Sequence, residues 1–125
     1  MARVLLVDDD HAIRETIAGL LRDEGYAVDP VANGADALQH AGQAPPDVIL
    51  LDLMMPVMNG WAFIAARQRE GALASVPVVV MSAARGLAET AQGLYAQGVR
   101  ACLVKPFDMD VLIGIVDRLT RQSAA

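Results

Sequence analysis

The sequence predicts an α/β fold, in which a (βα)5 chain forms one doubly wound, five-stranded parallel sheet. Short apolar runs rich in Val, Leu and Ile recur along the chain, and each is followed by a longer segment whose apolar residues have helical spacing. Because the central runs are apolar throughout, the sheet needs helices on both of its faces. Right-handed crossovers then favour the strand order 2-1-3-4-5.

In the first half of the chain, three expected strands alternate with two expected helices. The strands are residues 4–7, residues 26–28 with Val31, and residues 48–51. The apolar face of the first helix is formed by Ile13, Ile17, Leu20 and Leu21. Asn33 is a suitable N-cap for the second helix, and Pro45-Pro46 ends that helix before the third strand.

In the second half, three helices alternate with two strands, which are expected at residues 76–81 and 101–104. Asn59 is a suitable N-cap for the third helix, and Asp108 for the fifth. The apolar face of the fifth helix is formed by Leu112, Ile115, Val116 and Leu119. The fourth helix, residues 87–97, contains Gly93, and an interior glycine costs about 0.5–1 kcal/mol relative to alanine. This helix is therefore expected to be intrinsically soft.

Length and composition exclude several classes of protein. The chain has 125 residues, 54% of them hydrophobic, so we expect one globular domain over residues 1–125 with no effector domain. The net charge is −5 and the basic residues are scattered, which argues against direct nucleic-acid binding. Cys102 is the single cysteine, so no internal disulfide forms. The apolar run before the aspartates is too short for a signal peptide or a membrane span, which predicts a cytoplasmic protein without membrane contact.

Polar side chains follow four of the expected strands. Asp8 and Asp9 follow the first, Asp52 the third, Ser82 the fourth and Lys105 the fifth. In open α/β sheets, ligands bind beyond the carboxyl ends of the strands, near the point where the strand order reverses. Three carboxylates this close would repel one another unless a cation lies between them. Acidic oxygens at an open edge suit Mg²⁺, with Mn²⁺ as the alternative ion.

This combination of groups predicts a phosphoryl-accepting site. A carboxylate held beside Mg²⁺ and a lysine can act as a nucleophile toward phosphorus, and we expect Asp52 in that role. Mg²⁺ and Lys105 would neutralise charge on the transferring phosphoryl oxygens, and Ser82 would donate a hydrogen bond to one of them. No histidine or glutamate is expected at this edge as a base for hydrolytic water, so the acyl phosphate would persist as a signal. Asp10 is expected to be only the N-cap of the first helix.

Four motifs, "VLLVDDD", "DVILLDLMMPVMNG", "VVVMSA" and "LVKPFD", have the order and spacing of a known family. On these residues the chain resembles the receiver domain of bacterial two-component response regulators, from Arg3 to about Gln122. The resemblance implies a phosphoprotein of signal transduction that catalyses only its own phosphorylation and slow dephosphorylation. The donor would be a sensor histidine kinase or, in a phosphorelay, a histidine phosphotransfer protein. The fold of this family is flavodoxin-like.

The resemblance also implies how the metal is held. Asp9 and Asp52 would ligate Mg²⁺ directly and Asp8 partly through water, with the backbone carbonyl of Met54 as a further ligand. Asp52 would be the phosphoacceptor. Met54 and Ala84 have no polar side chain to assist hydrolytic water, so we expect a long-lived phosphate.

Further roles follow from the resemblance for residues around the phosphoryl group. Lys105 would pair with it, and the peptide bond to Pro106 is typically cis in this family. Ser82 would move toward the phosphate on activation, and the small Ala83 would leave room for it. Cys102 stands where receivers usually carry an inward-turning aromatic, so output would rely on Ser82 and backbone shifts. We interpret Cys102 itself as a small buried apolar residue.

The resemblance leaves the output open. Phosphorylation would change the face formed by the fourth helix, fifth strand and fifth helix, which would then control an unidentified protein partner or form a phosphorylation-linked homodimer. The chain is either a stand-alone receiver or a fragment of a larger regulator or hybrid kinase. A phosphatase similar to the haloacid dehalogenases is the alternative of a different class, but it needs a second acid where Met54 stands. A flavin-binding protein of the same fold would meet phosphate repulsion from the three aspartates at residues 8–10.

Overall fold

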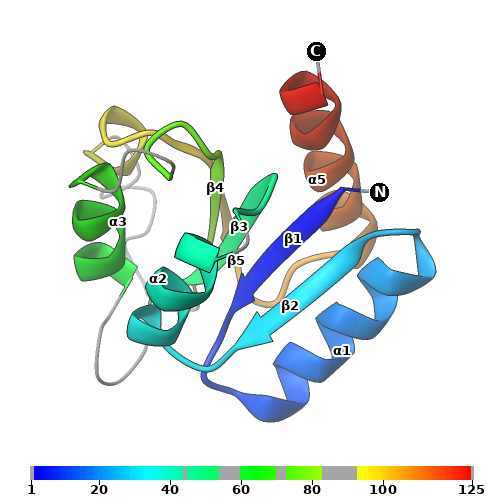
Figure 1. Ribbon diagram of the computed structural model, residues 1–125. Helices are drawn as coiled ribbons and strands as arrows, with labels where there is room; N and C mark the ends of the chain where they lie inside the picture. Colours follow the sequence, from blue (N-terminus) through cyan, green and yellow to red (C-terminus); the bar gives the residue numbers. More distant parts are fainter. Residues whose placement is uncertain (1, 44, 54–59, 70–72, 83–92, 125) are drawn as a thin grey trace.

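The computed structural model describes residues 2–43, 45–53, 60–69, 73–82 and 93–124 (Figure 1). Within these ranges, five strands form one parallel sheet in the order β2-β1-β3-β4-β5, which confirms the predicted topology. The strands are β1 (Arg3–Val7), β2 (Ala27–Val31), β3 (Val48–Asp52), β4 (Val78–Ser82) and β5 (Val99–Val104).

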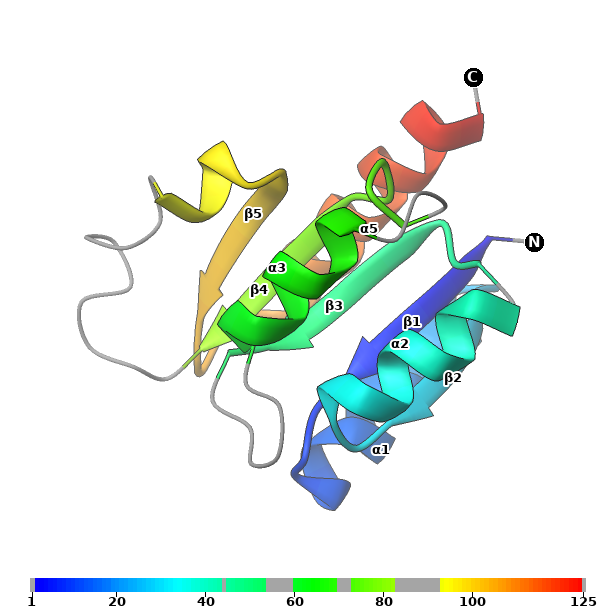
Figure 2. The ribbon, with the colours of Figure 1, turned by 60° about the vertical axis from the view of Figure 1, so that its left-hand side comes forward.

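Helices cover both faces of the sheet, as a fully buried parallel sheet requires. They are α1 (His11–Asp23), α2 (Gly34–Gln43), α3 (Gly60–Arg69) and α5 (Met109–Ala124). Figure 2 shows α2 and α3 on the near face and α1 and α5 on the far face. Residues 93–96 are helical and belong to the expected fourth helix, whose residues 87–92 lie outside the described part of the chain.

The central strands are apolar throughout because successive side chains point to opposite, equally buried faces. In β3, Ile49 and Leu51 pack with α2 and α3, whereas Val48 and Leu50 pack with α1 and α5. All four side chains have no exposed surface. Full burial of an aliphatic side chain contributes about 1.5–3 kcal/mol, so this alternation stabilises both layers of the fold.

Capping residues start the helices where the sequence predicts. The Asp10 side chain accepts the N–H of Ile13 (3.0 Å) at the start of α1. Asn33 Oδ1 accepts the N–H of Asp36 (2.9 Å) at the start of α2, and Asp108 Oδ1 accepts the N–H of Asp110 (2.8 Å) at the start of α5. Each bond satisfies a helix N–H that has no partner within the helix. The expected cap Asn59 lies outside the described residues.

Three predicted details differ from the structure. The buried face of α1 is formed by Ile17, Ala18 and Leu21, whereas the predicted face residues Ile13 and Leu20 are 36% and 37% exposed. Strand β4 begins at Val78, two residues later than expected, since Pro77 before it has no N–H to donate. Strand β5 begins at Val99, two residues earlier than expected, with a register shift against β4 between Val78 and Val79.

The sheet register brings the carboxyl ends of four strands together. Val7 of β1 lies opposite Leu51 of β3, so the residues that follow both strands meet at one edge. Ser82, the last residue of β4, lies opposite Val104, which directly precedes Lys105. In the described part of the chain, no helix is both long and apolar enough to span a membrane.

Candidate functional site

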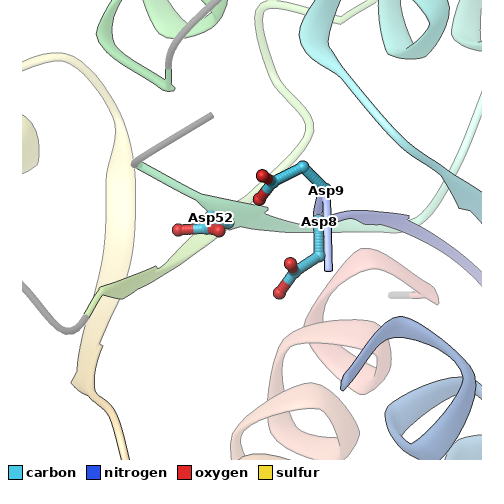
Figure 3. Close-up of side chains that lie close together, drawn as sticks. All are labelled: Asp8, Asp9 and Asp52. Atoms are coloured by element: carbon cyan, nitrogen blue, oxygen red, sulfur yellow. The ribbon is translucent and has the colours of Figure 1, made fainter. Parts of the chain in front are cut away.

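Three carboxylates gather where β1 and β3 end. Figure 3 shows Asp8 and Asp9 projecting from the end of β1 beside Asp52, the last residue of β3. One carboxylate oxygen from each residue lies within 4.8 Å of the others. Asp8 is fully buried and Asp52 is 6% exposed, whereas Asp9 is exposed to solvent. The cluster is therefore buried on the sheet side and open on the side of Asp9.

Lys105 supplies the positive charge that makes two buried carboxylates tolerable. Its Nζ lies 3.1 Å from Asp8 Oδ2 and 3.6 Å from Asp52 Oδ2. Buried ionised groups are stable only when paired, because desolvation otherwise favours their neutral form. One lysine against three carboxylates leaves a formal charge of −2 at the site. A divalent cation would balance that charge.

Asp8 is held at every polar atom by its neighbours. Its Oδ2 pairs with Lys105, and its Oδ1 accepts the N–H of Asp10 at 2.9 Å. Its own N–H donates to the Val31 carbonyl (3.2 Å), and its carbonyl accepts Nη1 of Arg14 (2.8 Å). Sequence reasoning missed Arg14, because its bond to Asp8 depends on how α1 turns back over the end of β1.

Ser82 and Lys105 are linked through the backbone at the same edge. Ser82 is fully buried at the end of β4, and its carbonyl accepts the N–H of Lys105 (2.9 Å). The peptide bond between Lys105 and Pro106 is cis. The ends of β4 and β5 are thus tied together beside the three carboxylates. The predicted metal ligand Met54 and the predicted positioning residue Ala83 both lie outside the described residues.

Cys102 lies half-buried on β5 and packs against the core cluster beneath α2 and α3. Burial raises the pKa of its thiol above the ordinary value, although a hydrogen bond with Tyr95 acts in the opposite direction. A thiol with a raised pKa is neutral at pH 7 and weakly nucleophilic. This environment agrees with the interpretation of Cys102 as a packing residue, although its burial is partial.

A second residue that the sequence did not indicate is Arg67 of α3, which is 2% exposed. Its guanidinium donates to the carbonyls of Val76 (2.8 Å), Ala74 (3.1 Å) and Gln97 (3.2 Å). It therefore ties α3 to the segments that precede β4 and β5. A charged residue within a helix normally indicates a solvated face, so its burial could not be predicted from the sequence.

The donor set of the site fits a hard divalent cation. Asp8, Asp9 and Asp52 offer only oxygen ligands, which Mg²⁺ and Mn²⁺ prefer over softer metals. The exposed side of the cluster leaves room for the water molecules that Mg²⁺ retains. The arrangement is consistent with a divalent metal site.

The comparisons with known proteins identify the family. The family model described as "Response regulator receiver domain" matches residues 4–117. The chain belongs to the response regulator receiver family. A receiver is a phosphoacceptor signalling module of two-component systems and not an enzyme that turns over a separate substrate, as expected from the motifs.

Individual relatives support the same assignment. Response regulator Rre1 of Synechocystis is 36% identical over 124 residues, which cover 98% of this chain and 53% of that protein. The chain spans about half the length of the curated relatives it matches.

Solved structures agree in fold. The chemotaxis protein CheY4 of Vibrio cholerae matches with a TM-score of 0.86 and 35% identity, over 95% of this chain and 98% of that one. The receiver domain of the Francisella response regulator 1452 matches with a TM-score of 0.89 and 28% identity, over 98% and 99% of the two chains. Both are therefore similar over nearly their whole length.

Proposed function

We propose that this receiver accepts a phosphoryl group on Asp52 from the phosphohistidine of a sensor kinase or a histidine phosphotransfer protein. The reaction depends on Mg²⁺, with Mn²⁺ as a substitute. The observation that carries this proposal is the position of Asp52, which shares a 4.8 Å carboxylate cluster with Asp8 and Asp9 and lies 3.6 Å from Lys105 Nζ. Phosphorylation then controls a protein partner.

The environments of the three acids favour Asp52 as the nucleophile. Asp8 has no exposed surface, and both of its carboxylate oxygens are already engaged. Among the described residues, Lys105 forms ion pairs with Asp8 and Asp52. Asp52 keeps a small exposed surface (6%) and lies beside a cation, which a carboxylate needs in order to approach an anionic phosphoryl group.

The transfer is a displacement at phosphorus. A carboxylate oxygen of Asp52 forms a bond to phosphorus while the P–N bond to the donor imidazole breaks, and the bonding electron pair stays on that nitrogen. Lys105 is close enough to Asp52 to neutralise charge on the incoming phosphoryl oxygens. We propose Ser82 as a hydrogen-bond donor to one of them.

The site residues have separate proposed roles toward the cation. Asp9 and Asp52 would hold Mg²⁺ directly and Asp8 through water, and we propose the backbone carbonyl of Met54 as a further ligand. When bound, the ion would neutralise charge on the phosphoryl oxygens. Asp8 is suited to an indirect role because Lys105 and the Asp10 N–H occupy its oxygens.

We propose that the signal leaves the site through the ends of β4 and β5. The bond between the Ser82 carbonyl and the Lys105 N–H supports this route, because a shift of either residue moves the other. The small Ala83 and Pro106 would shape the space around the phosphoryl group. Cys102 in place of an aromatic leaves the backbone link as the main connection. The face that includes β5 and α5 would bind the partner or a second phosphorylated copy.

We propose that residues 1–125 act as one receiver domain. The curated relatives are about twice as long as this chain. We therefore keep two proposals open, a receiver that acts alone and a receiver that serves a larger regulator or hybrid kinase. We propose the cytoplasm as its place of action, which rests on the family alone.

Phosphorylation with a small-molecule donor tests the proposal. The protein is incubated with phosphoramidate and Mg²⁺, and its intact mass is measured. We expect wild type to gain one phosphoryl group, Asp52→Asn to gain none, and EDTA to prevent the gain. Asp23→Asn, an exposed aspartate at the far end of α1, is the matched control and should react like wild type. An equal gain in Asp52→Asn would refute the role of Asp52.

A further inference from the structure

Arg14, in the first turns of α1, lies beside the acidic cluster. Its Nη1 donates to the backbone carbonyl of Asp8 at 2.8 Å, and its Nη2 lies 3.1 Å from Nδ1 of His11. Two contacts on one half-buried side chain fix the plane of the guanidinium group. The group therefore holds the Asp8 carbonyl in one orientation.

This bond fixes one of the two peptide units that flank Asp9. A peptide unit is planar, so fixing the carbonyl of Asp8 also fixes the N–H of Asp9. The following peptide unit is fixed by the Asp10 N–H, which donates to Asp8 Oδ1 at 2.9 Å. With both flanking planes fixed, the backbone dihedral angles of Asp9 are set, and so is the direction of the Cα–Cβ bond from which its carboxylate extends.

The side chain of Asp9 needs this support. It is exposed, and within the described residues its carboxylate makes no hydrogen bond or ion pair of its own. Asp8 and Asp52, in contrast, are buried and paired with Lys105. Of the three acids, Asp9 is the one whose position depends on its backbone.

We propose that Arg14 is a positioning residue for divalent-cation binding, acting through the Asp8 carbonyl to direct the Asp9 carboxylate into the site. The proposal rests on the function proposed above and adds a residue outside the acidic cluster and its lysine. Groups that orient metal ligands commonly change metal affinity by about 10–100-fold when removed. Because Arg14 orients its ligand through the backbone, we expect the lower end, about tenfold.

The positive charge of Arg14 and its hydrogen bond to Asp8 have opposite effects on cation affinity, so the experiment must separate them. A positive charge near the site disfavours a cation, so removing the charge alone would tighten binding. At about 1 M KCl the Debye length is about 3 Å, and this charge effect is screened, whereas the hydrogen bond to the Asp8 carbonyl persists. Weaker binding at high salt in a variant without Arg14 therefore reports lost orientation.

The experiment measures Mn²⁺ affinity by electron paramagnetic resonance of the free ion at low and high KCl. We expect Arg14→Gln to raise the Kd about tenfold at about 1 M KCl. Arg22→Gln is the matched control, because Arg22 also lies on α1 and also donates to a backbone carbonyl, that of Val28 at 3.0 Å, but away from the site. This control should leave the Kd unchanged.

A second readout separates orientation from general damage. Phosphorylation of Arg14→Gln by phosphoramidate should require more Mg²⁺ for half-maximal rate, yet reach the wild-type rate at saturating Mg²⁺. If Arg14→Gln does not fold, Arg14→Lys replaces it. Its ammonium group can still donate a hydrogen bond to the Asp8 carbonyl, so it should give a smaller increase in Kd.

Three results overturn the inference or what it rests on, and they are distinguishable. An unchanged or lower Kd in Arg14→Gln at high salt refutes the role of Arg14 alone. An equal increase in Arg22→Gln shows that loss of stability is the cause, which also refutes it. Wild-type protein that neither binds Mn²⁺ nor accepts a phosphoryl group refutes the proposed function itself.

Discussion

Replacing Lys105 by methionine should destabilise the metal-free protein by about 3 kcal/mol. At an effective dielectric constant of about 20, an ion pair at 3.1–3.6 Å has a gross attraction of about 5 kcal/mol. Desolvation offsets part of this, and breaking one side of a buried pair costs about 3–5 kcal/mol. The lysine side chain is 18% exposed, so the lower end applies. Methionine keeps most of the unbranched side chain and removes the ammonium group, with its charge and its hydrogen bond to Asp8.

Mg²⁺ should reverse part of this loss. A ligand at about 100 times its Kd stabilises the folded state by about 2.7 kcal/mol. Without the lysine, the three carboxylates would hold the ion more tightly, because their charge is no longer partly balanced. The difference in the free energy of unfolding between variant and wild type should therefore narrow as Mg²⁺ is added.

Urea denaturation with and without Mg²⁺ measures both effects. Arg118→Met, which removes an exposed positive charge from α5, is the control and should change the free energy of unfolding little. Two outcomes would refute the reasoning. One is equal stability of Lys105→Met and wild type without Mg²⁺, and the other is a difference that widens as Mg²⁺ is added.

Three further predictions follow from other parts of the structure. Burial raises the pKa of Asp29, but Arg3 (2.8 Å) and His40 (3.3 Å) together outweigh that effect, so the pKa lies below its ordinary value of 3.8. Asp29 therefore stabilises the fold above pH 3.8 and loses this contribution as the pH falls through its lowered pKa. In Asp29→Asn, the free energy of unfolding should decrease less steeply as the pH is lowered. A profile as steep as that of wild type would contradict this. Gly98 has φ +95°, and a Cβ at this position would lie 3.2 Å from the Arg67 guanidinium. Gly98→Ala should therefore lower the free energy of unfolding by about 1–2 kcal/mol in urea titrations. An unchanged urea midpoint would contradict this prediction. Because burial raises the pKa of Cys102, its alkylation by iodoacetamide at pH 8 should be slow in the folded protein and faster in urea, and equal rates would argue against the buried environment.

The topology and the acidic cluster could be predicted because both depend on general rules. Apolar runs and helical spacing identify strands and helices, and right-handed crossovers place the first strand beside the third. That arrangement alone brings Asp8 and Asp9 to the same edge as Asp52. The fifth strand then delivers Lys105 to this edge, where its amine pairs with two of the acids.

The features that could not be predicted depend on tertiary contacts between segments distant in the sequence. The burial of Arg67 follows from carbonyls of Ala74, Val76 and Gln97 that converge only in the folded chain. The bond from Arg14 to Asp8 likewise joins a helix to the residue that ends the preceding strand. Spacing and composition describe each segment by itself and therefore cannot identify such contacts.

Locating the phosphoryl group on the chain is the most direct test of the central claim. Protein phosphorylated with phosphoramidate and Mg²⁺ is reduced with borohydride, which converts an aspartyl phosphate into homoserine, and the modified residue is identified by peptide mass spectrometry. We expect homoserine at position 52 alone, and only when Mg²⁺ is present. Homoserine at Asp8, Asp9 or another aspartate, or modification that proceeds equally in EDTA, would contradict the assignment of Asp52 as the phosphoacceptor of a metal-dependent site.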